Sequence, residues 1–179
     1  TYAVRDAEIR EALSTITEAR VVVHTTESPD TPAWLNRHAV ILVCDGLIER
    51  RRFSLRVAAA NPLGASKGYV ETELILRSSL HFLELWSDVR KFRDMTTLAV
   101  VRAVLASRGV EHAVEVTAEP ALLPYCTQYR ETDLAFVSRL LEHEGFFYAI
   151  DASDDVVHLG DDTTTASSVD GPPFFEIHH

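Results

Sequence analysis

The spacing of apolar residues changes near residue 80, and this change restricts the folds that the chain can adopt. Before it, apolar and β-branched stretches recur between turn signals about 8–12 residues apart, a pattern typical of a small barrel or sandwich. Residues 69–77 alternate apolar and polar side chains, as a half-buried strand does. Further strands are predicted at residues 18–25, 40–44, 47–51 and 52–60, with loops at residues 27–31 and 61–68.

Two short stretches of this first half have helical character instead. Residues 7–15 contain helix-forming residues and predict no more than one turn. Residues 32–37 begin with Pro32, which suits the first position of a helix because the N–H that proline lacks has no partner there. We expect both stretches to be minor elements of a β-rich first half.

After residue 80 the apolar residues take up helical spacing. Thr96 or Thr97 can begin a helix over residues 97–108, and Gly109 can end it. A strand is expected at residues 110–117, followed by a loop at residues 119–124. The buried stripe of this helix is predicted to consist of Leu98, Val101, Val104 and Leu105.

A second helix is bounded in the same way. Thr132 can cap a helix over residues 132–144, and Gly145 can end it. Strands are expected at residues 146–150 and 156–159, so the second half is predicted to be α+β. The apolar face of this helix is made by Leu134, Val137, Leu140 and Leu141.

Charge and hydropathy exclude two classes of partner. The chain has 17 basic and 27 acidic residues, a formal net charge of −10. Residues 1–90 hold 11 Lys/Arg and 12 Asp/Glu, whereas residues 91–179 hold 6 and 15. Phosphate backbones are bound by clustered Lys and Arg, so we expect no nucleic-acid partner. The apolar runs are far shorter than the ~20 residues of a membrane helix, so no stable membrane insertion of this region is expected.

No motif indicates an enzyme, a cofactor or a metal site. The GxSxG, GxGxxG and Walker sequences are absent. Glu142, His143 and Glu144 are adjacent, so on a helix they point in directions about 100° apart and share no metal-binding face. The aspartates at 154–155 and 161–162 lack the spacing of an EF-hand and are expected to lie in solvated turns. Four histidines also lack partners at ligand spacing, namely His24, His81, His112 and His158. We therefore expect no catalytic residue, no metal and no cofactor.

The two cysteines lie 82 positions apart in apolar stretches. No CxxC pair is present, which argues against a zinc site or a redox pair. Cys44 and Cys126 are therefore predicted to be reduced thiols in the core.

Charged residues crowd the start of the second helix. Arg130 and Glu131 precede Asp133, which stands in the first turn, where the helix dipole favours a carboxylate. Arg139 follows Asp133 by six positions and is not its direct neighbour on a helix. We expect Arg130 or Arg139 to pair with carboxylates of another segment, in a network that fixes the helix against the sheet or forms a subunit contact. The alternative is a catalytic role.

The segment over residues 125–148 contains a distinctive series of residue types. It reads Tyr-Cys-x-Gln-Tyr-Arg-Glu-Thr-Asp, then Phe-Val-x-Arg-Leu, then Glu-x-Glu-Gly followed by aromatic residues. This series resembles the Vgr family (VgrG) of type VI secretion spike proteins, which share a fold with the baseplate hub protein of contractile phage tails. Weaker echoes at residues 11–14, 20–23, 32–43, 92–96 and 156–162 follow in the family's order, whereas residues 61–68 and 78–86 depart from it. The matching residues are Tyr125, Cys126, Gln128, Tyr129, Arg130, Glu131, Thr132, Asp133, Phe136, Val137, Arg139, Leu140, Glu142, Glu144, Gly145 and Tyr148.

The resemblance implies a fold and a structural function. The family's hub region has two barrel-like modules with an α+β insertion between them. We expect residues 1–86 to form the β-barrel-like hub module, and residues 87–179 to form the α+β module with the start of the following strands. The implied function is to join the Hcp tube to a membrane-puncturing needle, and no bond is made or broken by this region.

The resemblance also implies partners and a location. Full-length members form a ring of three copies that contacts Hcp tube rings, baseplate proteins, and tip or effector proteins. They assemble in the bacterial cytoplasm and are then secreted through the injection machine. The chain starts at Thr1 and not at Met, so we expect it to be an excised piece that is monomeric by itself.

Two other functions stay open at this point. One is a baseplate hub of a phage tail or of an extracellular contractile particle, which the motifs do not separate from type VI secretion. The other is a small hydrolase or binding enzyme that uses Glu142, His143 or Arg130. That function requires these side chains to converge in a closed pocket with strongly shifted acidities.

Overall fold

The computed structural model describes residues 3–66, 68–117 and 120–162. Within these ranges the chain is mostly β, with ten strands, two α-helices and two short 3₁₀ helices. The sheets there have the strand orders β1-β2-β5-β4-β3, β7-β10-β9 and β6-β8. The strands are β1 (Ala3–Arg10), β2 (Glu18–Thr25), β3 (His38–Asp45), β4 (Ile48–Ser66), β5 (Tyr69–Arg77), β6 (Ser87–Thr96), β7 (His112–Glu115), β8 (Leu122–Thr132), β9 (Phe147–Asp151) and β10 (Val156–Gly160); the helices are α1 (Thr97–Ser107), α2 (Asp133–Glu144), η1 (Thr31–Trp34) and η2 (Ser79–Glu84).

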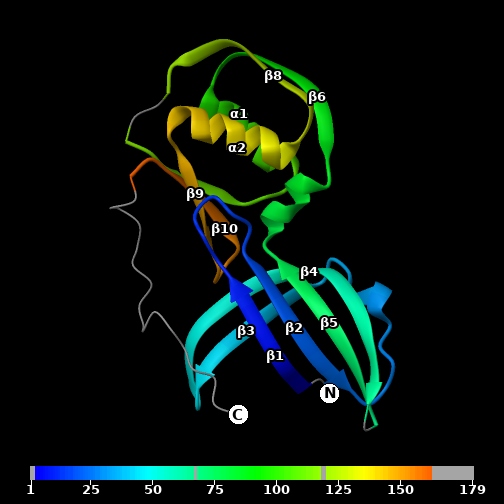
Figure 1. Ribbon diagram of the computed structural model, residues 1–179. Coiled ribbons are helices and arrows are strands. Elements are labelled where there is room, and N and C mark those ends of the chain that lie inside the picture. Colours follow the sequence, from blue (N-terminus) through cyan, green and yellow to red (C-terminus); the bar gives the residue numbers. More distant parts are fainter. Residues whose placement is uncertain (1–2, 67, 118–119, 163–179) are drawn as a thin grey trace.

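The five-stranded sheet is antiparallel throughout and curls into a half-barrel (Figure 1). Its strand β4 spans 19 residues, so the segments expected at 47–51 and 52–60 are one strand, which also runs through the expected loop after residue 60. β4 stays paired with β5 there because register shifts between Val57 and Ala59 and between Pro62 and Gly64 absorb the extra residues. Local loop signals are thus overridden by pairing with a neighbouring strand.

The first element is a strand, so the helical turn expected within residues 7–15 is wrong. β1 pairs with β2, from Ala3 opposite His24 to Arg10 opposite Glu18. An isolated segment of this length gains little from helix formation in water. The ladder to β2 satisfies its backbone groups instead, and this pairing outweighs the local helical preference.

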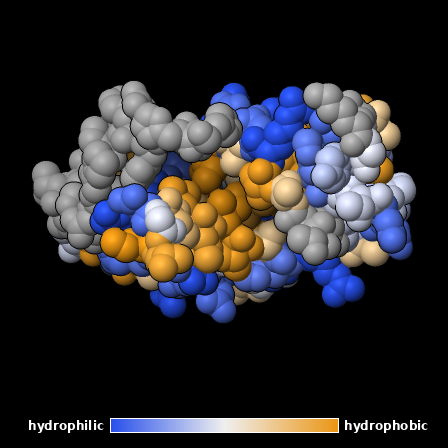
Figure 2. Space-filling model, turned by 90° about the horizontal axis from the view of Figure 1, so that it is seen from below, coloured by the Kyte–Doolittle hydropathy of each residue, from blue (hydrophilic) through white to orange (hydrophobic). Residues whose placement is uncertain are grey.

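One face of the half-barrel carries the first hydrophobic cluster. Phe53 and Leu55 of β4 are 2% and 0% exposed, and they contact residues of β2, β3 and β5 in this cluster. Figure 2 views the molecule from the half-barrel side, and hydrophobic surface gathers in the middle of this view. The half-barrel leaves part of its apolar face accessible to solvent, because several members of the cluster are only partly buried, including Ala7, Ile9, Ala39, Ile41 and Val43.

The two cysteines differ in exposure. Cys126 is buried on β8, and this burial raises the pKa of its thiol. Cys44 is exposed, so the expectation that both thiols lie in the core is wrong for it. The apolar run around Cys44 belongs to β3, which lies at an edge of its sheet and is not covered on both faces.

Both α-helices begin and end at the capping residues that the sequence indicates. The Thr96 and Thr132 hydroxyls each accept a hydrogen bond from the N–H three residues on, at 3.2 and 3.1 Å. Gly109 and Gly145 follow the two helices with φ of +67° and +76°. These left-handed conformations favour glycine over residues with a β-carbon.

The helices pack between the β6–β8 ribbon and the β7-β10-β9 sheet (Figure 1). A second hydrophobic cluster joins these layers. In it, Val101 of α1, Phe136 of α2 and Leu159 of β10 are at most 1% exposed, and Cys126 of β8 packs with them from the ribbon. No helix in the described ranges is both long enough and apolar enough to cross a membrane.

The module boundary expected near residue 86 remains a prediction. Residues on each side of it pack into the hydrophobic cluster of the other side. Leu80 and Leu83 of η2 precede it in sequence but belong to the second cluster. Ala152, in the β9–β10 turn, belongs to the first cluster, and its carbonyl accepts a 2.6 Å hydrogen bond from the Ser54 N–H. The β9–β10 turn therefore ties the helical part of the molecule to the half-barrel.

Truncation of two leucines on neighbouring strands tests the position of the half-barrel core. Leu55→Ala removes a fully buried side chain, so we expect a loss of about 2–5 kcal/mol in the free energy of unfolding. Leu42→Ala changes a side chain that is 48% exposed and should stay within about 0.5 kcal/mol. Urea denaturation measures both, and similar losses from the two variants would contradict this assignment of faces.

The carboxylate of Asp155, in the β9–β10 turn, makes the free energy of unfolding depend on pH. The Ser79 N–H donates to both carboxylate oxygens of Asp155, at 2.9 and 3.0 Å. Burial is the largest influence on this group and raises its pKa, although Ser79 and the nearby Arg56 and His38 oppose the shift. Folding therefore favours the protonated form, and this contribution is full below about pH 4 and is lost as pH rises through the folded pKa.

Asp155→Asn removes this titration without changing the size of the side chain. We expect the unfolding free energy of the wild type, minus that of the variant, to fall as pH rises from about 4. Urea denaturation at a series of pH values measures the difference. A difference that stays level or grows with pH would show that Asp155 does not behave as a buried acid.

Candidate functional site

The residues singled out by the sequence lie where β8 runs into α2. β8 pairs with β6 in an antiparallel ribbon, although no strand was predicted for either segment and part of the start of β8 was expected to be a loop. The chain turns from strand to helix at Thr132, and the Asp133 N–H donates to the Trp86 carbonyl at 2.9 Å. This bond fixes the start of α2 beside the start of β6.

The Asp133 side chain is fully buried and is held by three side chains. Oδ2 accepts from Arg108 Nε at 2.6 Å, and Oδ1 accepts from Gln128 Nε2 at 2.8 Å. Arg90 Nη2 also donates to Oδ1. The donors come from the end of α1, from β8 and from β6. We call Asp133, Arg90, Arg108 and Gln128 the Asp133 clamp.

The polar groups of the clamp also bond to one another and to the backbone. Gln128 is fully buried; its Oε1 accepts from Arg90 Nε at 2.8 Å, and its Nε2 donates to the Glu131 carbonyl at 3.1 Å. The Arg108 guanidinium lies 4.7 Å from the centre of the Trp86 ring. A buried carboxylate needs this degree of pairing, because an unpaired charge is very unfavourable in a protein interior.

The clamp offers little to a ligand. Both Asp133 oxygens are occupied by protein donors, and the side chain has no exposed surface. The arrangement joins β6, α1, β8 and α2 at one point. Its chemistry is that of a structural ion-pair network.

A second ion pair extends along α2. Arg139 Nη2 donates to Glu131 Oε1 at 2.6 Å, and this hydrogen bond is the main cause of a raised Arg139 pKa. The Arg139 guanidinium also lies 5.3 Å from the centre of the Phe136 ring, which stacks on Phe92 of β6 at 5.8 Å. Arg139 pairs with β8 in this way and does not contact the clamp carboxylate.

Some of the remaining motif residues pack in the core or bond to a helix end, and others are exposed. Leu140 is buried on α2, and Glu144 accepts a 2.7 Å hydrogen bond from the Thr97 hydroxyl. Tyr125 and Tyr129 are 51% and 63% exposed. Arg130, with φ of +51°, places its guanidinium 5.3 Å from the Tyr129 ring centre. These three side chains lie outside the Asp133 clamp.

The other candidate residues do not converge. Glu142 and His143 are exposed at the end of α2. Four histidines have separate partners: His24 with Glu71, His81 with the Ser78 carbonyl, His112 with the Val110 carbonyl, and His158 with Glu115. In the ranges that the structure describes, no group of three or more His, Cys, Asp or Glu could hold a metal ion.

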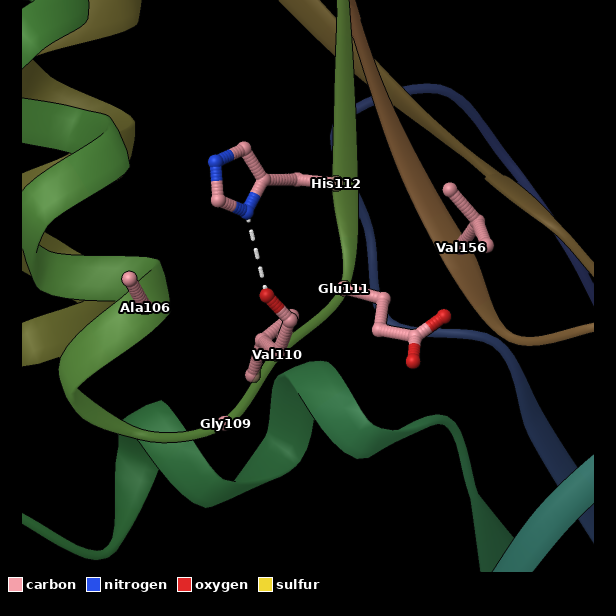
Figure 3. A pocket seen from close by; sticks show the side chains of 6 residues that line it. All are labelled: Ala106, Gly109, Val110, Glu111, His112 and Val156. Atoms are coloured by element: carbon pink, nitrogen blue, oxygen red, sulfur yellow. Dashed lines mark hydrogen bonds between the residues drawn. The ribbon is translucent and has the colours of Figure 1, made fainter.

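A depression beside the end of α1 lacks the geometry of a reaction site. It is lined by Ala106, Gly109, Val110, Glu111, His112 and Val156. Figure 3 shows that the side chains of Glu111 and His112 point to opposite sides of the chain. The His112 Nδ1 lies 3.1 Å from the Val110 carbonyl oxygen. The two polar side chains therefore do not form an acid–base pair.

Sequence reasoning missed the partners of Asp133. Arg90 and Arg108 lie 43 and 25 positions before it, so no local spacing connects the three residues. The signal that was available is weaker. A carboxylate at the start of an amphipathic helix needs hydrogen-bond donors if it is buried, and Arg108 is an available cation at the end of the preceding helix.

Substitution of the clamp carboxylate tests its contribution. Asp133→Asn leaves Arg90 and Arg108 facing a neutral amide, and breaking a buried pair typically costs about 3–5 kcal/mol. Glu131→Gln removes one partner of a more exposed pair with Arg139 and should cost at most about 1 kcal/mol. Chemical denaturation measures both, and equal losses would contradict a dominant role for the clamp.

Comparisons with known proteins match nearly the whole chain. The model of the family described as phage tail baseplate hub (GPD) matches residues 10–177. The type VI secretion system spike protein VgrG5 of Pseudomonas aeruginosa is 38% identical over 103 residues, which are 54% of this chain and 13% of that protein. VgrG1b of the same organism is 31% identical over 128 residues, 69% of this chain and 17% of that protein. The chain thus spans less than a fifth of the length of these relatives.

Solved structures share the fold at low sequence identity. The Escherichia coli c3393 protein, a component of the type VI secretion system, has a TM-score of 0.80 at 19% identity, over 94% of this chain and 51% of that one. A tail protein from Neisseria meningitidis MC58 has a TM-score of 0.65 at 16% identity, over 92% and 47%. The predicted resemblance is therefore confirmed: the chain belongs to the phage tail baseplate hub (GPD) family.

Proposed function

We propose that this chain is a structural part of the hub of a type VI secretion spike, and that it works by forming subunit contacts and not by catalysis. The observation that carries the proposal is the open half-barrel. Part of its apolar face remains accessible although the rest of the sheet is well packed. Apolar surface of this kind is typical of a region that is covered in an assembly.

The edge strand β3 supports the same function. Val40 and Leu42 are 43% and 48% exposed on one of its faces, while Ile41 and Val43 pack partly against the cluster on the other. Strands that are apolar on both faces are usually covered on both. A long apolar edge strand also presents backbone groups that can pair with another chain. We infer that β3 is covered in the full-length protein.

The finer organisation follows the family. Residues 1–86 are the β-barrel-like hub module, and residues 87–179 are the α+β module that is inserted between two barrels. The full-length protein is a homotrimer that joins Hcp tube rings to the needle and contacts baseplate, tip or effector proteins. It assembles in the bacterial cytoplasm and leaves through the machine. The similarity to the type VI secretion spike proteins VgrG5 and VgrG1b supports a role in a spike.

A phage tail hub is the second candidate. The tail protein from Neisseria meningitidis, which shares the fold, favours it. Neighbouring genes distinguish the two: sheath, Hcp and ATPase genes accompany type VI secretion, whereas capsid genes accompany a phage.

The assembly is tested on the full-length protein with substitutions on the β3 edge. We expect light scattering to give the mass of a trimer for the wild type. Val40→Glu with Leu42→Glu should reduce the mass to that of a monomer, because two charges would have to be buried in the contact. A strain that carries this variant should also fail to release the tube protein.

The matched control places a charge on an exposed apolar residue away from β3. Leu13 is 51% exposed in the connection between β1 and β2, and Leu13→Glu should leave the trimer intact. A wild-type protein that remains monomeric would refute the trimer. A trimer that tolerates the β3 substitutions would remove β3 from the contact.

A further inference from the structure

The outward face of the β6–β8 ribbon has a composition unlike the rest of the molecule. Alternation and register place Val89, Lys91 and Arg93 of β6 beside Tyr129, Thr127 and Tyr125 of β8. Five of these six residues are exposed, and Thr127 is half-buried. We call these six residues the ribbon outer face. The opposite face of the ribbon packs on the helices through Phe92 and Cys126.

The ribbon outer face is cationic in an acidic chain. The net charge of the chain is −10, yet this face carries Lys91 and Arg93 and no carboxylate. Among the described residues, the ion pairs of the ribbon are made by Arg90 with Asp88 and Asp133 and by Glu131 with Arg139, and none includes Lys91 or Arg93. The polar neighbour that they share is the Tyr125 hydroxyl. Both charges are therefore available to a partner.

The electrostatic setting of Tyr125 agrees with this description. Its pKa is lowered, first by a hydrogen bond with Thr127 and then by Lys91 and Arg93. At the other end of the face, the Arg130 guanidinium lies over the Tyr129 ring. The face thus presents two tyrosine rings, with cations beside and between them.

We propose that the ribbon outer face binds an acidic, extended segment of a partner protein. Lys91 and Arg93 are two positions apart on one strand, so their charges repeat at about 6.8 Å. Carboxylates at alternate positions of an extended segment repeat at the same distance. Tyr125 and Tyr129 supply large, rigid and amphipathic contact surfaces of the kind enriched at protein interfaces.

Charge decides between a protein and a nucleic acid as the occupant. A nucleic acid would also meet aromatic rings and cations here. However, the chain as a whole is strongly acidic, and two or three cations release few counterions from a phosphate backbone. A short acidic peptide segment gains the same local contacts with a smaller total charge, so it is the occupant that fits this face.

The Asp133 clamp makes this face a rigid one. Arg90, which lies between Val89 and Lys91 on β6, points to the other side of the strand and holds Asp133. Gln128, between Thr127 and Tyr129, does the same from β8. The ribbon outer face therefore has a fixed backbone, which reduces the entropy lost on binding. The proposal rests on this geometry and does not depend on the function proposed above.

The experiment measures binding of a fluorescein-labelled peptide with alternating Glu and Val by fluorescence anisotropy. The intact 179-residue chain should bind this probe, and binding should weaken as salt is raised. Lys91→Glu with Arg93→Glu should weaken it at least tenfold, because attraction becomes repulsion. Tyr125→Ser with Tyr129→Ser should also weaken binding, although the charge is unchanged.

Two controls make the outcomes decisive. Arg37→Glu with Arg102→Glu produces the same change in net charge at exposed sites elsewhere and should leave binding unchanged. A labelled single-stranded oligonucleotide should bind more weakly than the acidic peptide. The proposal is overturned if the probe does not bind, if both double charge reversals weaken it equally, or if the oligonucleotide binds more tightly. Circular dichroism confirms that each variant is folded.

Discussion

The carboxylate of Asp133 sets the arrangement of the helical part of this molecule. A fully buried charge is tolerated only where protein groups replace water, and here two guanidiniums and an amide do so. Because these donors come from β6, α1 and β8, the four elements cannot move apart without exposing or isolating a charge. The hydrophobic cluster around Phe136 and Phe92 fills the space between these elements, whose relative positions the clamp fixes.

The half-barrel is organised by a different constraint. Its strands satisfy one another's backbone groups, and its core face is well buried near Leu55 but only partly buried along β3. The β9–β10 turn closes one end through Ala152 and Ser54. The rest of the apolar face lacks cover among the described residues. This contrast between a well-packed helical part and a partly covered sheet is the basis of the subunit contact that we propose.

The ends of both α-helices could be predicted from the sequence, because capping depends on only a few neighbouring residues. Thr132 and Gly145 bound α2 as expected, and the alternation of apolar and polar residues identified β5. Strands that form only because a distant segment pairs with them could not be predicted in this way. Residues 7–10 and 61–66 lack strand character by themselves, yet they belong to β1 and β4 because β2 and β5 pair with them. Cys44 was expected in the core because the sequence does not show that β3 is an edge.

The sequence alone determined the β-rich first half, the two capped helices and the family, because each depends on neighbouring residues or on one continuous motif. Only the tertiary structure decided what the motif does. Arg90 and Arg108 reach Asp133 from distant positions, and a contact between segments 43 and 25 residues apart leaves no trace in local spacing. It also decided that Tyr125 and Tyr129 face outward beside Lys91 and Arg93, since that side depends on how β6 pairs with β8.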